Sequence, residues 1–233
     1  MPTILIRDQL KKHANPLKAA NPFFFKTGIG GYAEHDQFLG VTVPVVRSIA
    51  RQFSDLPLEE ITFLLQSIYN EERLLALFIL ILQYKKGSDA HKRIIYDYYR
   101  ANMAHINNWN LVDASAHEII GAYLFHYTQD KNVLVTLAQS NNLWEQRIAM
   151  IATLYFIRKS DVSWTYMIAE ILLHDKHDLI HKAVGWMLRE AGKKDEKQLL
   201  SFLDKNAFHM PRTMLRYAIE KLPIDVRREY MKR

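Results

Sequence analysis

Residues 107–116 read Asn-Asn-Trp-Asn-Leu-Val-Asp-Ala-Ser-Ala, and they open a helical pattern that continues to about residue 127. Asn107 or Asn108 is a suitable N-cap, because an asparagine side chain can accept hydrogen bonds from the first free amides of a helix. Trp109 and Asp113 are four residues apart, so on a helix they lie on one face. An acid beside an aromatic side chain, in a chain with a basic surplus, suggests a site.

The same helical pattern covers most of the chain. Apolar residues recur at spacings of three and four after residue 43, whereas the alternation typical of strands is missing. The predicted helices are 3–14, 16–26, 44–53, 57–68, 70–86, 89–104, 108–127, 130–139, 143–159, 162–174, 178–192, 195–205, 212–221 and 224–231. We therefore predict an all-α protein with a single domain over residues 1–233. Its N-terminal helices and a glycine-rich loop occupy 1–44, and helical repeats occupy about 45–233.

A repeat relates five of these helices, each of which begins with a polar stretch and then becomes apolar. The equivalent residues are Arg73, Asp113, Arg147, Lys182 and Arg216, at intervals of 40, 34, 35 and 34 residues. A period near 35 with two helices per unit is typical of an α-solenoid of HEAT-like repeats. Equivalent positions line up along one surface of a solenoid, so we expect a concave basic groove that contains one carboxylate. Nearby cations favour the charged form of a carboxylate, so we expect Asp113 to be ionised at neutral pH.

The amino-acid composition excludes several classes of protein. Lys and Arg exceed Asp and Glu by 31 to 25, a net charge of +6, which is compatible with nucleic acid but is shared by many other proteins. The absence of cysteine excludes a disulfide scaffold and thiolate metal sites, and it fits a reducing compartment. No apolar run is long enough to span a membrane, and the N-terminal apolar run is too short for a signal peptide. We expect a cytoplasmic protein, and the spacing of the histidines predicts no metal site.

The basic row allows two interpretations. Each cation could pair with a helix-capping acid or with a carbonyl group of the next repeat, and so hold the stack together. Alternatively, the row could follow the phosphates of a nucleic acid.

The acid and the aromatic residue also allow two interpretations. Trp109 could be a packing residue and Asp113 could pair with Arg147 of the next repeat. Alternatively, Trp186 could converge with both on one groove, since two indole rings and a carboxylate can hold a cationic group.

Four stretches resemble the AlkD family of bacterial HEAT-like-repeat DNA alkylation-repair glycosylases. They are Phe38-Leu-Gly-Val-Thr-Val-Pro-Val-Val-Arg47, Trp109-Asn-Leu-Val-Asp113, Asn142-Leu-Trp-Glu-Gln-Arg147 and Lys182-Ala-Val-Gly-Trp-Met-Leu-Arg-Glu190. The resemblance implies excision of N3- and N7-alkylated purines from double-stranded DNA, without metal or cofactor. We expect a monomer, because a solenoid groove needs no symmetric partner. The sequence departs from the family pattern at Asn108, where a second Trp is expected, and at Asn110, where Asp is expected.

The resemblance also implies roles for individual residues. Asp113 corresponds to the catalytic carboxylate, and Trp109 and Trp186 correspond to the residues that flank the damaged nucleotide. The DNA backbone contacts that it implies are Arg147, Arg189 and Lys193. We expect further backbone contacts from Lys182 of the basic row, from Thr42 of the glycine-rich loop and from Arg47. In the glycine-rich loop, Tyr32 is a further candidate for ligand contact. Two alternatives stay open, a DNA-binding protein of this fold without base excision and a HEAT-like scaffold for protein partners.

Overall fold

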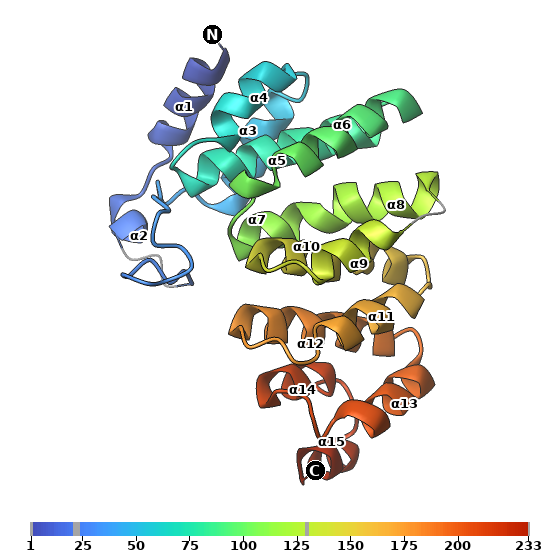
Figure 1. Cartoon of the computed structure of the whole chain (residues 1–233). Helices are drawn as coiled ribbons and strands as arrows, with labels where there is room; N and C mark the ends of the chain where they lie inside the picture. Colours follow the sequence, from blue (N-terminus) through green and yellow to red (C-terminus); the bar gives the residue numbers. More distant parts are fainter. Residues whose placement is uncertain (1, 21–23, 129–130, 233) are drawn as a thin grey trace. The chain divides into compact units, whose positions relative to one another are not determined.

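The computed structural model describes residues 2–20, 24–128 and 131–232, which are helices joined by turns (Figure 1). Within these ranges no segment forms a strand, and one isolated bridge joins Gln37 to Tyr69. The predicted all-α class is confirmed. None of the described helices is both long and apolar enough to cross a membrane. The chain divides into two compact units, Met1–Ser115 and Ala116–Arg233.

The first unit is built around a buried central helix. Its helices are α1 (Pro2–Lys12), α2 (Pro16–Ala20), α3 (Val43–Gln52), α4 (Leu58–Leu65), α5 (Asn70–Lys86), α6 (Asp89–Ala101), the 3-10 turn Met103–His105 and most of α7 (Trp109–Ala116). Residues 74–81 of α5 are all apolar and buried, and a helix that is apolar on every side belongs inside a core. Helix α5 accordingly packs against α3, α4 and α6, and α1 covers α3 and α4 (Figure 1).

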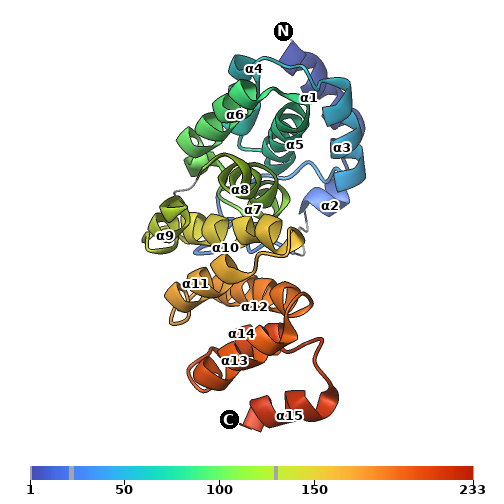
Figure 2. The same ribbon diagram turned by 90° about the vertical axis from the view of Figure 1, so that its right-hand side faces the viewer.

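The second unit has two layers of helices. After the π-helical turn His117–Gly121 come α8 (Ala122–Tyr127), α9 (Asn132–Ala138), α10 (Leu143–Arg158), α11 (Ser163–Ile171), α12 (Asp178–Gly192), α13 (Glu196–Asn206), α14 (Arg212–Ala218) and α15 (Ile224–Lys232). Helices α10, α12 and α14 pack in succession in one layer, and α9, α11 and α13 form the other (Figure 2). Pairs of helices that stack on their neighbours make an α-solenoid, as the repeat predicts.

Two glycines of the second unit allow neighbouring helical segments to approach closely, Gly121 of the π-helical turn against α10 and Gly185 of α12 against α14. A Cβ atom at Gly121 would lie 2.2 Å from the carbonyl oxygen of Ala152, and a Cβ atom at Gly185 would lie 2.5 Å from that of Met214. No side chain fits at either distance. The backbones therefore pack directly against each other at both positions.

The predicted helix bounds are close to the observed ones, with two corrections. Helices α5 and α12 begin and end at the predicted residues. The predicted helix 16–26 is too long, since α2 ends at Ala20 and the chain is in a turn at Phe24 and a bend at Phe25, while residues 21–23 lie outside the described part. The predicted helix 108–127 is interrupted by the π-helical turn, which the spacing of apolar residues does not reveal.

Candidate functional site

The start of α7 is tied to two distant parts of the first unit. Asn108 is fully buried directly before the helix, and its Nδ2 donates to Asp36 Oδ2 at 2.6 Å. Asn110 donates through Nδ2 to Asn70 Oδ1 at 2.7 Å. These bonds hold α7 to the loop before α3 and to the first turn of α5. The two positions at which the sequence departs from the family pattern are therefore the two that anchor this helix.

The expected side-chain N-cap of α7 is not formed. The backbone carbonyl of Asn108 accepts from the amides of Leu111 and Val112, both at 3.1 Å, so Asn108 occupies the capping position. The side-chain oxygens of Asn107 and Asn108 have no hydrogen-bond partner among the described residues. The predicted capping residue is therefore correct in position, but its side chain donates to Asp36 instead of accepting from the free helix amides.

Trp109 is the first residue of α7, and an aromatic partner covers one side of its indole. The ring of Phe25 stacks on it with a centroid distance of 5.2 Å and an interplanar angle of 18°. Phe38 packs on Phe25 at 4.6 Å. Sequence reasoning did not identify Phe25, because the predicted helix over 16–26 carried no signal for an aromatic contact with a residue more than 80 positions away. The three rings form an aromatic cluster beside the start of α7.

Asp113 follows Trp109 by one turn of α7 and is partly buried. Its charge acts on Tyr99, which is fully buried and shares a 2.9 Å hydrogen bond with the hydroxyl of Ser115. Burial raises the pKa of Tyr99 most strongly, the bond to Ser115 lowers it, and the negative charge of Asp113 raises it further. The carboxylate therefore lies near a phenol that stays protonated.

The polar start of α5 is a buried anchoring cluster. Arg73 forms an ion pair with Asp36, and the side chains are only 7% and 4% exposed. Glu71 accepts hydrogen bonds from the backbone amides of residues 39, 40 and 41 at 3.0, 2.8 and 3.3 Å. Glu72 binds Arg7 at 3.0 Å. Asp36 is neither a helix-capping acid nor a carbonyl group of the next repeat, but it leaves Arg73 buried and paired, so this guanidinium contributes little exposed positive charge.

Arg147 also serves the stack. It is buried, and its Nη1 donates to the carbonyl of Leu179 in the following repeat. This is the contact to a neighbouring carbonyl that the structural interpretation of the row predicts. The implied contact of Arg147 with the DNA backbone stays a prediction.

The cations of α12 are paired with acids. Lys182 lies 2.7 Å from Asp178, and Arg189 binds Glu220 and lies 3.2 Å from Glu190. Lys193 contacts Glu190 at 2.7 Å. A DNA phosphate that binds these cations must therefore compete with the neighbouring carboxylates.

The pKa values of these carboxylates reflect that pairing. Burial alone would raise the pKa of Glu190, but hydrogen bonds and positive charge from Lys193 and Arg189 lower it below its ordinary value of 4.5. Hydrogen bonds from Lys221 and Arg189 lower the pKa of Glu220. Both acids are therefore charged at neutral pH.

Three further candidates lie in the first unit. The guanidinium of Arg47 lies 4.2 Å from the centre of the Phe78 ring, a cation–π contact. Thr42 is exposed at the N-cap position of α3 and makes no capping bond through its side chain. Tyr32 donates to the carbonyl of Phe24 at 3.0 Å, so it braces the glycine-rich loop.

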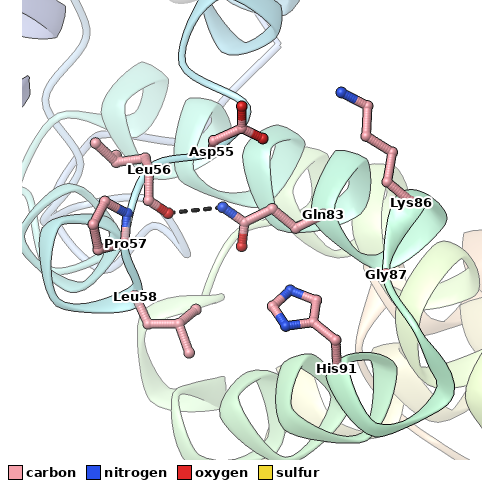
Figure 3. A pocket seen from close by; sticks show the side chains of 8 residues that line it. All are labelled: Asp55, Leu56, Pro57, Leu58, Gln83, Lys86, Gly87 and His91. Atoms are coloured by element: carbon pink, nitrogen blue, oxygen red, sulfur yellow. Dashed lines mark hydrogen bonds between the residues drawn. The ribbon is translucent and has the colours of Figure 1, made fainter.

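A hollow of about 350 Å³ in the first unit lies at the turns that join α3 to α4 and α5 to α6 (Figure 3). Gln83 crosses it and donates to the carbonyls of Ser54 and Leu56 at 3.0 and 2.7 Å. Asp55, Lys86 and His91 line the same hollow, so its charges are mixed. Gln83 thus gives the hollow a structural role, because this residue of α5 braces the turn between α3 and α4.

The predicted site residues are thus distributed over both units. Trp109, Asp113, Arg47 and Thr42 belong to the first. The second contains Arg147, Lys182, Trp186, Arg189 and Lys193. Trp186 lies on α12 and is partly buried. Within the described residues, no group of three or more His, Asp or Glu side chains could hold a metal ion.

A family model described as "DNA alkylation repair enzyme" matches residues 6–222. The chain belongs to the DNA alkylation repair enzyme family. The family that the sequence motifs predict is therefore confirmed. No curated protein sequence matches the chain significantly.

A solved structure has the same fold as this chain. It is described as "Predicted DNA alkylation repair enzyme from Enterococcus faecalis", and it superposes with a TM-score of 0.70. It shares 17% sequence identity and covers 91% of this chain and 98% of its own. At this identity the likeness shows the fold, an all-helical α-solenoid.

Proposed function

We propose that this DNA alkylation repair family member is a monofunctional DNA glycosylase that releases N3- and N7-alkylated purines from duplex DNA. The observation that carries the proposal is the pair Trp109 and Asp113, one turn apart on a helix whose start is anchored through Asn108 and Asn110. A rigid helix can hold a carboxylate in one position, and rigid placement is what a preorganised catalytic group requires.

The chemistry of the lesion explains why a single carboxylate suffices. Alkylation at N3 or N7 makes the purine cationic, so the base departs with the electrons of the C1′–N bond and needs no proton from the enzyme. The deoxyribose is left with oxocarbenium-like charge, as in glycoside hydrolysis. Asp113 stabilises that charge and accepts the proton of the water that attacks C1′. One preorganised group of this kind contributes about 3–4 kcal/mol to the transition state.

The other site residues bind and orient the damaged strand. Trp109 and Trp186 pack against the deoxyribose and favour a cationic base through their ring faces. The proposed backbone contacts are Arg147, Arg189, Lys182, Lys193, Arg47 and Thr42. The protein acts as a monomer in the bacterial cytoplasm, without metal or cofactor. Affinity for DNA falls steeply with salt because phosphate contacts release counterions.

Base release from a 7-methylguanine duplex tests the proposal. We expect Asp113→Asn to lower the rate of release on the order of 100- to 1,000-fold, which corresponds to about 3–4 kcal/mol, while affinity for the duplex stays within about threefold. Asp8→Asn is the matched control, because it removes an exposed carboxylate from α1 and should leave the rate unchanged. Release by Asp113→Asn at the wild-type rate would remove Asp113 from this role. No release by the wild type, together with tight DNA binding, would instead leave a DNA-binding protein of the same fold.

A further inference from the structure

A second positively charged feature lies at the end of the chain. A hollow of about 310 Å³ opens between α14 and α15. It is lined by Arg216, Ile219, Ile224, Arg227, Arg228 and Met231. The four lining residues of α15 occupy spacings of three, four and seven, so they form one face of that helix. Each wall thus combines arginine side chains with an apolar surface.

The face of α15 is held in place from both sides. Arg212 of α14 donates through Nη2 to the carbonyl of Met231 at 2.5 Å. The hydroxyl of Tyr230 donates to Asp204 of α13 at 2.9 Å, and the Tyr230 side chain is buried. These contacts fix α15 beside the hollow, which Arg227 and Arg228 line.

The electrostatics of the hollow differ from those of α12. No acid lines it. Among the described residues, the side chains of Arg216, Arg227 and Arg228 form no ion pair or hydrogen bond. By contrast, Arg189 and Lys193 are each paired with carboxylates. Three guanidinium groups around one concavity, without acidic partners, make a strong local attraction for an anion.

We propose that this hollow binds a phosphate group of duplex DNA and extends the DNA contact to the last two helices. Guanidinium groups match phosphate oxygens in pairs of parallel hydrogen bonds, which favours a phosphate over a diffuse attraction. Ile224 and Met231 offer apolar surface to the adjoining deoxyribose. The choice of DNA as the occupant rests on the proposed function, while the hollow and its uncompensated charge do not.

The salt dependence of DNA binding tests this proposal. The dissociation constant for an undamaged duplex is measured between 50 and 200 mM salt for the wild type, for Arg227→Gln with Arg228→Gln, and for Lys197→Gln with Lys205→Gln. The lysine pair is the matched control. Both lysines are exposed on α13 and do not line the hollow, and this variant also removes two positive charges. Loss of one phosphate contact should make the slope of log affinity against log salt shallower by about 0.9. The arginine variant then loses about 3.5-fold more affinity at the low salt concentration than at the high one.

The outcomes separate this proposal from the glycosylase proposal. A shallower slope for the arginine variant than for the lysine control supports the hollow as a phosphate site, whether or not the wild type releases 7-methylguanine. Equal slopes for the two variants overturn it, even if base release is normal. Failure of the wild type to bind duplex DNA also overturns it. Displacement of the duplex by a glutamate peptide as readily as by a competing oligonucleotide would show that the hollow prefers acidic protein segments, and this too overturns the phosphate assignment. Far-ultraviolet circular dichroism verifies that both variants remain folded.

Discussion

Asp36 accepts hydrogen bonds from Arg73, Asn70 and Asn108, and so joins the loop before α3 to the starts of α5 and α7. A buried carboxylate is tolerated only when charge and hydrogen bonds compensate for the lost water, and these partners supply both. The same bonds fix the start of α7, because Asn108 directly precedes that helix. They therefore also help to position Trp109 and Asp113, which both lie on it. Asp36 is therefore a positioning residue for the proposed site.

Replacement of Asp36 by Asn should be strongly destabilising. The amide keeps the size of the side chain but leaves Arg73 buried without an opposite charge, and the loss of one member of a buried ion pair costs about 3–5 kcal/mol. Urea unfolding measures the change in the free energy of unfolding. Asp8→Asn, which removes an exposed charge from the same unit, should change it by less than about 0.5 kcal/mol. A cost below about 1 kcal/mol for Asp36→Asn would contradict the anchoring role.

At the scale of helices, the α10–α12–α14 layer of the second unit depends on direct backbone contact. Gly185 of α12 faces the carbonyl of Met214 and the Cβ atom of Tyr217, both 2.5 Å from the place where its own Cβ atom would be. Neither neighbour is the flexible end of a side chain, so a methyl group at this position must separate α12 from α14. Close packing of this kind sets the spacing of successive repeats.

We therefore expect Gly185→Ala to lower the free energy of unfolding. Alanine favours the helix by about 1 kcal/mol over glycine, but overpacking against a fixed backbone costs about 3 kcal/mol, so the net loss is about 2 kcal/mol. Thermal or urea unfolding provides the measurement. Gly28→Ala is the control, since no atom lies within 4 Å of its added methyl group and its stability should change little. A Gly185→Ala variant as stable as the wild type would show that the layer can adjust at this point.

At the scale of the whole molecule, the chain consists of two compact units. In the first, α5 is the buried centre, whereas in the second the stacked layers share one continuous core. In a solenoid each element contacts mainly its neighbours, so stability is approximately a sum of local terms. The effect of a substitution should therefore be largest in its own unit.

Native-state hydrogen exchange tests this locality. Asp36→Asn should lower the protection of amides in α5 and α3 more than that of amides in α10 and α12. Gly185→Ala should do the opposite, because its strain acts between α12 and α14. Exchange that opens locally reports the stability of each region separately. An equal loss of protection throughout the chain for both variants would show that the two units unfold as one cooperative body.

The helices, the repeat and the family could be derived from the sequence, because they depend on local patterns. Apolar spacing placed α5 and α12 at their observed bounds, and the landmark interval predicted the solenoid. Trp109 and Asp113 were identified because both lie on one helix. Partners that are distant in the chain were decided only by the tertiary structure, since a charged side chain pairs with whatever the fold brings within reach. Arg73 meets Asp36 from 37 positions away, and Arg147 meets the carbonyl of Leu179 from 32 positions away. Folding likewise stacks Phe25 on Trp109 and leaves the arginines of α14 and α15 without acidic partners, and no local pattern encodes either arrangement.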